Sequence, residues 1–182
     1  VELMGGRDAF IGKLDSLFTA DSKLEGESTS VDISGLIGQY AHGNEPSHHI
    51  AHLYNYVGQP WRTQEIVDEV LHTLYFNNPD GLSGNEDCGQ MSAWYILNAM
   101  GFYQVCPGKP VYSIGRPLFN EATVHLKDGK SFKVIAHNNS RDNKYVQSIV
   151  LNGNKLETPF FTHQDIVDGG TLELTMGSEP LK

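Results

Sequence analysis

The stretch CPGKP, at residues 106–110, divides the sequence into two parts whose apolar residues recur with different periods. Before this stretch, apolar residues return every three or four positions, which is typical of amphipathic helices. After it, they alternate with polar residues over short runs separated by glycine-containing turns, which is typical of strands. We therefore expect an α+β fold with a helical part over residues 1–104 and a β-rich part over residues 105–182.

The first part contains four segments with helical spacing. We expect helices over residues 5–18, 47–57, 60–74 and 90–100. Pro60 suits the first turn of its helix, and Gly101 suits the end of the last one. The polar stretch 21–32 is expected to be an exposed loop. The first part should therefore consist of helical hairpins joined by polar loops.

The second part contains two expected hairpins and a final strand. The strands should cover residues 122–126 and 131–136, then 146–151 and 155–157, and finally 171–176. Glycine-containing turns at 127–130 and 152–154 join the members of each pair. We expect these strands to form an antiparallel sheet.

Acidic residues are concentrated in the first part of the chain. The 182 residues carry a net charge of −9, and residues 1–104 hold 14 acidic and four basic side chains. Without a basic face the chain is not expected to bind nucleic acid, and no apolar run reaches the roughly 18 residues of a membrane span. Cys88 and Cys106 are too few for a disulfide framework or a zinc cluster.

The first candidate site combines an amide, a carboxylate and three histidines within ten residues. Asn44 and Glu45 precede a helix in a glycine-bounded turn, where oxygen ligands suit a hard cation such as Ca²⁺. His48 and His52, four apart on one helix, could instead form a zinc site beside His49 and a carboxylate. We favour a structural role, in which the histidines satisfy backbone donors at the start of the helix.

The second candidate site is GNEDCGQ, residues 84–90, just before an apolar helix. Its two glycines allow the backbone to approach a ligand closely, and a carboxylate held there could activate a water molecule as a general base. Glu86 equally suits the N-terminus of the helix that follows. Cys88 is expected to be a packed thiol, because no histidine pattern supports a nucleophile.

Together, residues 38–49 (GQYAHGNEPSHH) and 81–95 (GLSGNEDCGQMSAWY) resemble glycoside hydrolase family 92. These enzymes are calcium-dependent, inverting, exo-acting α-mannosidases that are common in gut bacteria. Residues 112–117 (YSIGRP) and the strand-rich tail resemble the C-terminal region of the family, so the resemblance covers essentially the whole chain. It implies the last helices of an (α/α)6 barrel followed by a β region, and therefore a C-terminal fragment of a longer enzyme.

The resemblance also implies roles for particular residues. Asp87 falls on the general base, and Asn44 and Glu45 fall on a pair near the calcium and the terminal mannose. Glu86 would contribute to substrate binding, whereas Asn85 stands where some members have a further aspartate. The general acid, a glutamate, would lie upstream of this chain, so the isolated fragment is expected to be inactive.

The expected partner is a mannose-containing glycan, with α-1,2-linked mannose from N-glycans or mannan as the substrate. The longer parent enzyme would be periplasmic, at the cell surface or secreted, and the fragment is expected to self-associate through barrel surface left exposed. Two alternatives are a non-catalytic carbohydrate-binding module and a metalloenzyme built on His48, His49 and His52. Metal content distinguishes the metalloenzyme from the mannosidase, because one equivalent of zinc favours the histidine site, whereas calcium or no metal favours the mannosidase.

Overall fold

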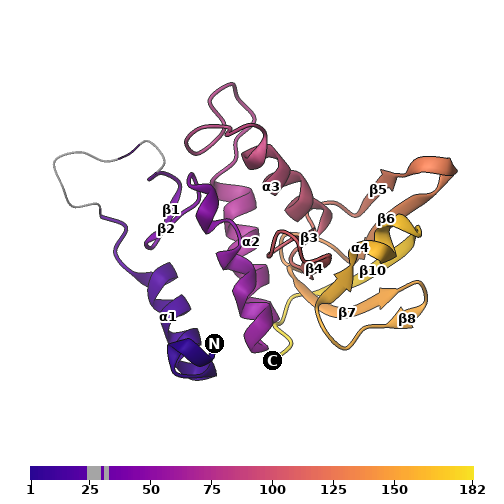
Figure 1. Cartoon of the computed structure of the whole chain (residues 1–182), viewed down its shortest axis with the longest axis horizontal. Coiled ribbons are helices and arrows are strands. Elements are labelled where there is room, and N and C mark those ends of the chain that lie inside the picture. Colours follow the sequence, from indigo (N-terminus) through magenta and orange to yellow (C-terminus); the bar gives the residue numbers. More distant parts are fainter. Residues whose placement is uncertain (24–29, 31–32) are drawn as a thin grey trace.

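The computed structural model describes residues 1–23, 30 and 33–182, so most of the expected loop 21–32 lies outside the described residues. The longer helices occupy one side of the molecule, and the larger sheet, with a short helix against it, occupies the other (Figure 1). None of the helices among the described residues is long and apolar enough to span a bilayer.

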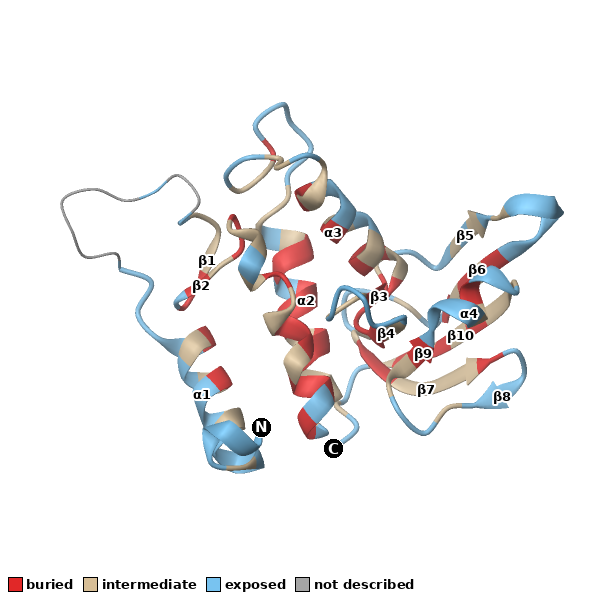
Figure 2. Ribbon diagram, in the orientation of Figure 1, coloured by how far each residue is buried: buried red, intermediate tan, exposed pale blue. Residues whose placement is uncertain are grey.

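Three α-helices form where their spacing predicts them: α1 (Arg7–Thr19), α2 (Pro60–Thr73) and α3 (Gln90–Met100). Pro60 is the first residue of α2, and Gly101 ends α3 in a left-handed conformation. Figure 2 shows buried residues on α2 and α3, whereas α1 is exposed over most of its length.

The prediction of a single helix over residues 47–57 was wrong. Two 3₁₀ segments, η2 (Glu45–Ser47) and η3 (Ile50–Val57), replace it, and His48 and His49 lie between them. Because a 3₁₀ segment repeats every three residues, side chains four positions apart no longer share a face. A further 3₁₀ turn, η1 (Glu2–Met4), precedes α1.

A two-stranded hairpin, β1 (Leu36–Ile37) and β2 (Tyr40–Ala41), links α1 to η2. Its turn contains Gly38, whose φ is +59°. A side chain at this position would collide with the backbone of Leu17 and Phe18 in the last turn of α1. The hairpin therefore packs directly against the end of α1.

The larger sheet has the strand order β5-β6-β10-β7-β8. Its strands are β5 (Glu121–His125), β6 (Ser131–His137), β7 (Tyr145–Leu151), β8 (Asn154–Lys155) and β10 (Gly170–Gly177), with η4 (Lys127–Gly129) between β5 and β6. Both expected hairpins are confirmed. The expected antiparallel arrangement fails at one pair, because β10 runs antiparallel to β7 but parallel to β6.

A smaller antiparallel sheet joins the two parts of the chain. It contains β3 (Phe102–Tyr103), β4 (Val111–Ile114) and β9 (Phe160–Thr162), and the short helix α4 (His163–Val167) follows it. Since β3 precedes and β4 follows the expected boundary at 105–110, this sheet bridges that boundary. Leu97 packs against both the helical core and the core of the larger sheet.

Candidate functional site

The structure brings Glu45 and Asp87 together, although 41 residues separate them along the chain. Glu45 begins η2, and the Asp87 side chain makes a hydrogen bond with it. The pKa of Glu45 is lowered, first by a hydrogen bond from its own backbone amide and then by this bond with Asp87. A pair of carboxyl groups in such contact shares a proton or holds a cation.

Local backbone conformation creates this contact. Asp87 and Cys88 have φ values of +52° and +57°, and Gly89 follows at +93°. Consecutive left-handed residues are costly except at glycine and are found mostly where function requires them. Nearby, a side chain at Gly84 would come within 3.2 Å of the Gly43 carbonyl oxygen, so the two acidic turns lie backbone to backbone.

Asn44 precedes η2 with an extended backbone and is half-buried. Its carbonyl oxygen accepts hydrogen bonds from the backbone amide and the hydroxyl group of Ser47, at 3.0 and 2.7 Å. The structure therefore fixes the backbone of Asn44 next to Glu45.

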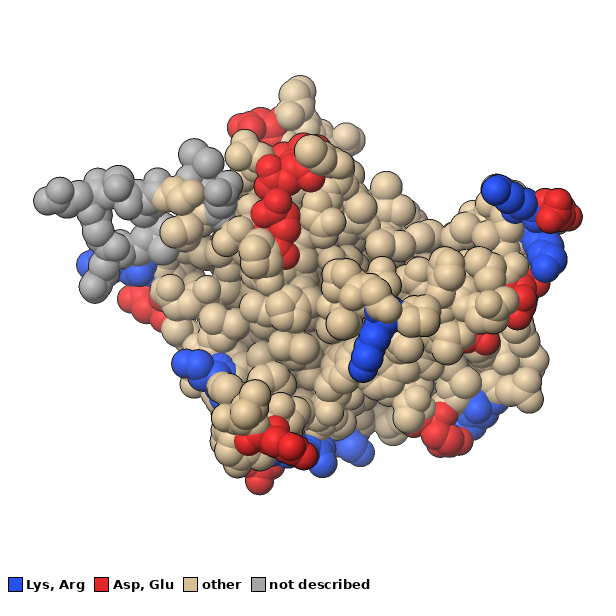
Figure 3. Space-filling view, in the orientation of Figure 1, with Lys and Arg blue, Asp and Glu red and all other residues tan. Residues whose placement is uncertain are grey.

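A cavity of about 370 Å³ adjoins this pair of turns. Its lining includes Glu45, His48, His49, Gln90, Tyr103 and Gln104. Figure 3 shows acidic side chains gathered at the end of the molecule where the loop before α3 lies. Pro46, Ala93, Leu97, Val105 and Pro107 complete the lining, so a few carboxylate, imidazole, amide and phenol groups stand in a largely apolar hollow, as is usual in sites that orient a small ligand.

His48 is buried in the wall of this cavity. Its Nε2 lies 2.9 Å from the carbonyl oxygen of His42, which can only accept, so Nε2 carries the proton. Its Nδ1 then accepts a hydrogen bond from Gln90 Nε2 at 3.0 Å. Burial lowers the pKa of His48, which keeps the ring neutral at pH 7.

His42 lies beneath the site and links β2 to α3. Tyr75 donates its proton to the Met91 carbonyl oxygen at 3.0 Å, so it accepts from His42 Nε2 at 2.7 Å. The Tyr40 hydroxyl donates to His42 Nδ1 at 2.9 Å. Burial lowers the pKa of His42 to about 3, so this ring is neutral as well.

The prediction that His48 and His52 share one face was wrong, because the helix is broken between them. His52 instead bonds Asn98 Oδ1 at 2.8 Å through Nε2 and Ser113 Oγ at 3.1 Å through Nδ1. Among the described residues, no group of three or more His, Cys, Asp or Glu side chains could hold a metal ion. The favoured role, in which the histidines satisfy backbone donors at the start of the helix, was wrong, because neither side chain caps a 3₁₀ segment.

Glu86 satisfies the N-terminus of α3. Its carboxylate accepts hydrogen bonds from the backbone amide of Ser92 at 3.0 Å and from the Ser92 hydroxyl at 2.8 Å. The prediction of a packed thiol at Cys88 was wrong: Cys88 is exposed, because it lies in the surface turn before α3 and not on the buried face of the helix.

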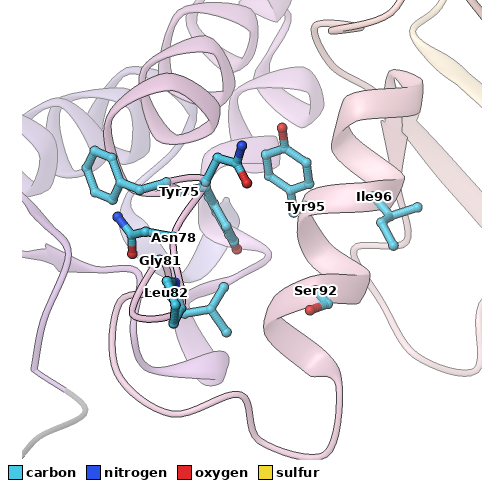
Figure 4. A pocket seen from close by; sticks show the side chains of 10 residues that line it. Tyr75, Asn78, Gly81, Leu82, Ser92, Tyr95 and Ile96 are labelled. Atoms are coloured by element: carbon cyan, nitrogen blue, oxygen red, sulfur yellow. The ribbon is translucent and has the colours of Figure 1, made fainter.

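A second cavity, of about 490 Å³, lies on the other flank of α3. Figure 4 shows Tyr95 projecting from α3 toward Tyr75 and the turn that contains Asn78, with Ile96 on the neighbouring face of the helix. Phe76 and Ile96, which line it, are both more than half exposed. Aromatic residues are frequent in this part of the sequence, but their spacing alone does not locate the cavity.

Sequence reasoning missed three residues that organise the site: His42, Gln90 and Tyr103. Gln90 Nε2 reaches both His48 Nδ1 and Tyr103 Oη, the latter at 3.1 Å. His42 and Gln90 lie inside the two resembling motifs, so their proximity to the acidic residues in sequence was a usable signal. Tyr103 carried no local signal.

The chain is similar to several solved and sequenced glycosidases. A family GH92 α-mannosidase from Bacteroides thetaiotaomicron is 44% identical, with a TM-score of 0.87 over 97% of this chain and 23% of its own. A GH92 inverting mannosidase from the same organism is 43% identical, with a TM-score of 0.83 over 98% and 25%. An uncharacterised secreted glycosidase from Arthroderma benhamiae is 31% identical over 98% of this chain and 21% of its length. These likenesses define the class as glycoside hydrolase.

The family follows from the match to a sequence model. The glycosyl hydrolase family 92 catalytic domain matches residues 1–178, and the chain belongs to this family. The resemblance inferred from the two motifs is thus confirmed. The chain spans only about a fifth to a quarter of the length of the relatives described above.

Proposed function

We propose that this chain supplies the general base and part of a calcium site to an inverting exo-α-mannosidase. The observation that carries the proposal is the meeting of the two acidic turns, in which Asp87 contacts Glu45 and Glu45 in turn lines a cavity. The α-mannosidase from Bacteroides thetaiotaomicron described first above has also been solved in complex with mannoimidazole, in a structure that matches this chain with 43% identity and a TM-score of 0.91. The proposed substrate is terminal α-1,2-linked mannose of N-glycans or mannan.

The contact also limits the role of Glu45. Inverting glycosidases separate their acid and base by about 6.5–9.5 Å, which leaves room for the attacking water. Because Glu45 is hydrogen-bonded to Asp87, it is too close to act as the general acid across such a gap. We assign Asp87 as the base, Glu45 and Asn44 to ligand binding beside it, and the acid to a glutamate outside this chain.

The donor chemistry of Asn44 and Glu45 fits calcium, but their number does not complete a site. Ca²⁺ takes about six to eight oxygen ligands, and the described residues contain no group of three or more acidic, histidine or cysteine side chains able to hold a metal. Asn44 and Glu45 would therefore be a minority of the ligands. Bound calcium would hold sugar hydroxyl groups and favour distortion of the ring.

The proposed fold context is the last helices of an (α/α)6 barrel followed by the β region. The proposed location is outside the cytoplasm, at the cell surface, in the periplasm or in the medium. The description of the Arthroderma benhamiae relative as a secreted glycosidase is compatible with this location.

Mannose release from α-1,2-mannobiose tests the proposed function. A complete family 92 enzyme that contains this chain should release mannose and should lose activity with a calcium chelator. Asp87→Asn should lower kcat by about 10²–10⁴, whereas Asp80→Asn, on the exposed turn before the site, should leave it unchanged. A fully active Asp87→Asn enzyme would refute the assignment of the base.

The isolated chain should release no measurable mannose, because the proposed acid lies outside it and it spans only about a quarter of its relatives' length. The same mannobiose assay on the purified 182-residue chain checks this. Turnover by the chain alone would show that an acid is present within it.

A further inference from the structure

One side-chain hydrogen bond spans the two turns that carry the acidic residues. His48 lies three residues after Glu45, and Gln90 lies three residues after Asp87 and is the first residue of α3. Gln90 Nε2 donates to His48 Nδ1 over 3.0 Å. The bond therefore connects the turn of Glu45 to the start of α3, and each of its two residues lies three positions after one of the acidic residues.

The hydrogen-bond partners of His48 allow its Nδ1 only to accept in the bond with Gln90. Nε2 donates to the His42 carbonyl oxygen at 2.9 Å, so Nδ1 has only a lone pair to offer. His48 is 1% exposed, and the centroid of its ring lies 4.8 Å from that of His42. Neither the tautomer nor the position of Nδ1 can change without breaking a buried hydrogen bond.

Gln90 is oriented with similar precision. The same amide nitrogen also reaches Tyr103 Oη at 3.1 Å, so both of its protons have acceptors. This fixes which end of the amide faces His48, because the oxygen could not donate to Nδ1.

The other links between these segments do not replace this bond. Trp94 Nε1 donates to the His48 carbonyl oxygen at 3.0 Å, and Tyr75 connects His42 to the Met91 carbonyl oxygen. These two links involve Trp94 and Met91 of α3, and neither holds Gln90, the first residue of the helix. The left-handed residues 87–89, which present Asp87, come directly before Gln90.

We infer that His48 and Gln90 are positioning residues, whose hydrogen bond holds the turn of Glu45 against Asp87. The geometric part of this inference stands on the contacts alone, and its catalytic consequence rests on the proposed function. Without the bond, the first residue of α3 is released from His48, and Asp87, three residues before it, can move out of contact with Glu45.

Two substitutions of His48 each keep one of the two hydrogen bonds of its ring and remove the other. His48→Asn places an amide oxygen near the position of Nδ1 and keeps an acceptor for Gln90, but loses the bond to His42. His48→Gln places an amide nitrogen near Nε2 and keeps the bond to His42, but loses the acceptor for Gln90. Gln90→Met, at a half-buried position, removes the donor without touching the core and is the safeguard if the His48 variants fail to fold.

The geometric readout is carbon NMR of the 182-residue chain at one fixed pH. Replacing Asp87 by Asn should shift the Glu45 Cδ signal in the wild-type and His48→Asn backgrounds. In the His48→Gln and Gln90→Met backgrounds the same replacement should leave that signal unmoved. If Asp87→Asn shifts the Glu45 Cδ signal in the His48→Gln and Gln90→Met backgrounds as much as it does in the wild type, the inference is overturned, whatever the mannosidase activity proves to be.

The catalytic readout uses a complete family 92 enzyme that contains the chain. His48→Gln and Gln90→Met should lower kcat by at least about tenfold with little change in KM, since a misplacement of about 1 Å can cost about 10² in rate. His48→Asn should retain most of kcat. If His48→Asn and His48→Gln lose the same amount of kcat and also the same amount of Tm, the role of His48 is merely structural. That result would overturn its assignment as a positioning residue. An inactive wild-type enzyme would refute the proposed function, and the NMR result would still decide the geometry.

Discussion

At the scale of single residues, buried histidines organise the helical part through fixed tautomers. His42, His48 and His52 each have both ring nitrogens engaged, and each is neutral because burial lowers its pKa. A neutral imidazole donates through one nitrogen and accepts through the other, so it can join two segments with opposite requirements. The cost is sensitivity to acid.

We predict that acid destabilises the chain through His52, whose pKa burial lowers from 6.5 to about 4. The unfolded chain takes up a proton at this residue below pH 6.5, whereas the folded chain does so only near pH 4. Stability from this residue is therefore complete above pH 6.5 and falls by about 3 kcal/mol as the pH drops to 4. Urea unfolding from pH 7.5 to 4 measures the total fall, to which His42 and His48 also contribute because burial lowers their pKa values too.

His52→Gln is the control for this prediction. It keeps a donor for Asn98 Oδ1 but cannot titrate, so its stability should depend less steeply on pH between 6.5 and 4. Parallel pH profiles for wild type and His52→Gln would show that His52 does not titrate differently in the two states.

We predict that Gly38→Ala destabilises the chain by more than about 2 kcal/mol, because a left-handed alanine is strained and its Cβ meets the backbone of Leu17. Gly12→Ala is the matched control on exposed α1, where a Cβ meets nothing within 4 Å. It should stabilise by about 0.5–1 kcal/mol. Chemical denaturation compares them, and a neutral Gly38→Ala would contradict the tight contact with α1.

The sequence identified the acidic residues of the candidate site but not their contact. Asp87 and Glu45 stand out because each lies among glycines in a turn before a helical segment. Periodicity describes neighbours along one element and says nothing about residues 42 positions apart. The left-handed conformations of Asp87 and Cys88, which bring the turns together, depend on tertiary contacts and have no sequence signal at non-glycine residues.

At the scale of elements, long and regular patterns were predictable, and short or paired ones were not. The bounds of α3 match the expected residues 90–100, and both hairpins of the larger sheet form. The two-residue strands β1, β2 and β3 are too short for alternation to be recognised. The parallel pairing of β10 with β6 was also missed, because an alternating strand has the same pattern in either direction.

We predict that Glu86→Ala destabilises α3. The Glu86 carboxylate accepts two hydrogen bonds from Ser92 in the first turn, where a negative charge also favours the helix dipole. Its loss should cost about 1–2 kcal/mol in chemical denaturation. Glu69→Ala, at an exposed position of α2, should change stability by less than about 0.5 kcal/mol. Equal effects of both changes would argue against a capping role for Glu86.

At the scale of the whole molecule, the helical core and the core of the larger sheet are in contact. The helical core surrounds Trp94, the core of the larger sheet surrounds Phe132 and Leu172, and Leu97 packs against both. The smaller sheet crosses the same junction through β3 and β4. A substitution at this junction should therefore affect the stability of both parts of the chain. The boundary near 105–110 marks a change of sequence pattern, but the two parts pack against each other across it.

The chain should self-associate, and added salt should strengthen the association. Phe76 and Ile96, 58% and 55% exposed, border the cavity of about 490 Å³ beside α3, so copies can bury apolar surface there. The net charge of −9 repels copies at low ionic strength, and salt screens that repulsion. Sedimentation velocity should show the average mass rising with protein and salt concentration. Phe76→Ser combined with Ile96→Ser should reduce association, whereas Phe119→Ser, on the β-rich part, should not. A monomer at all salt concentrations would refute the prediction.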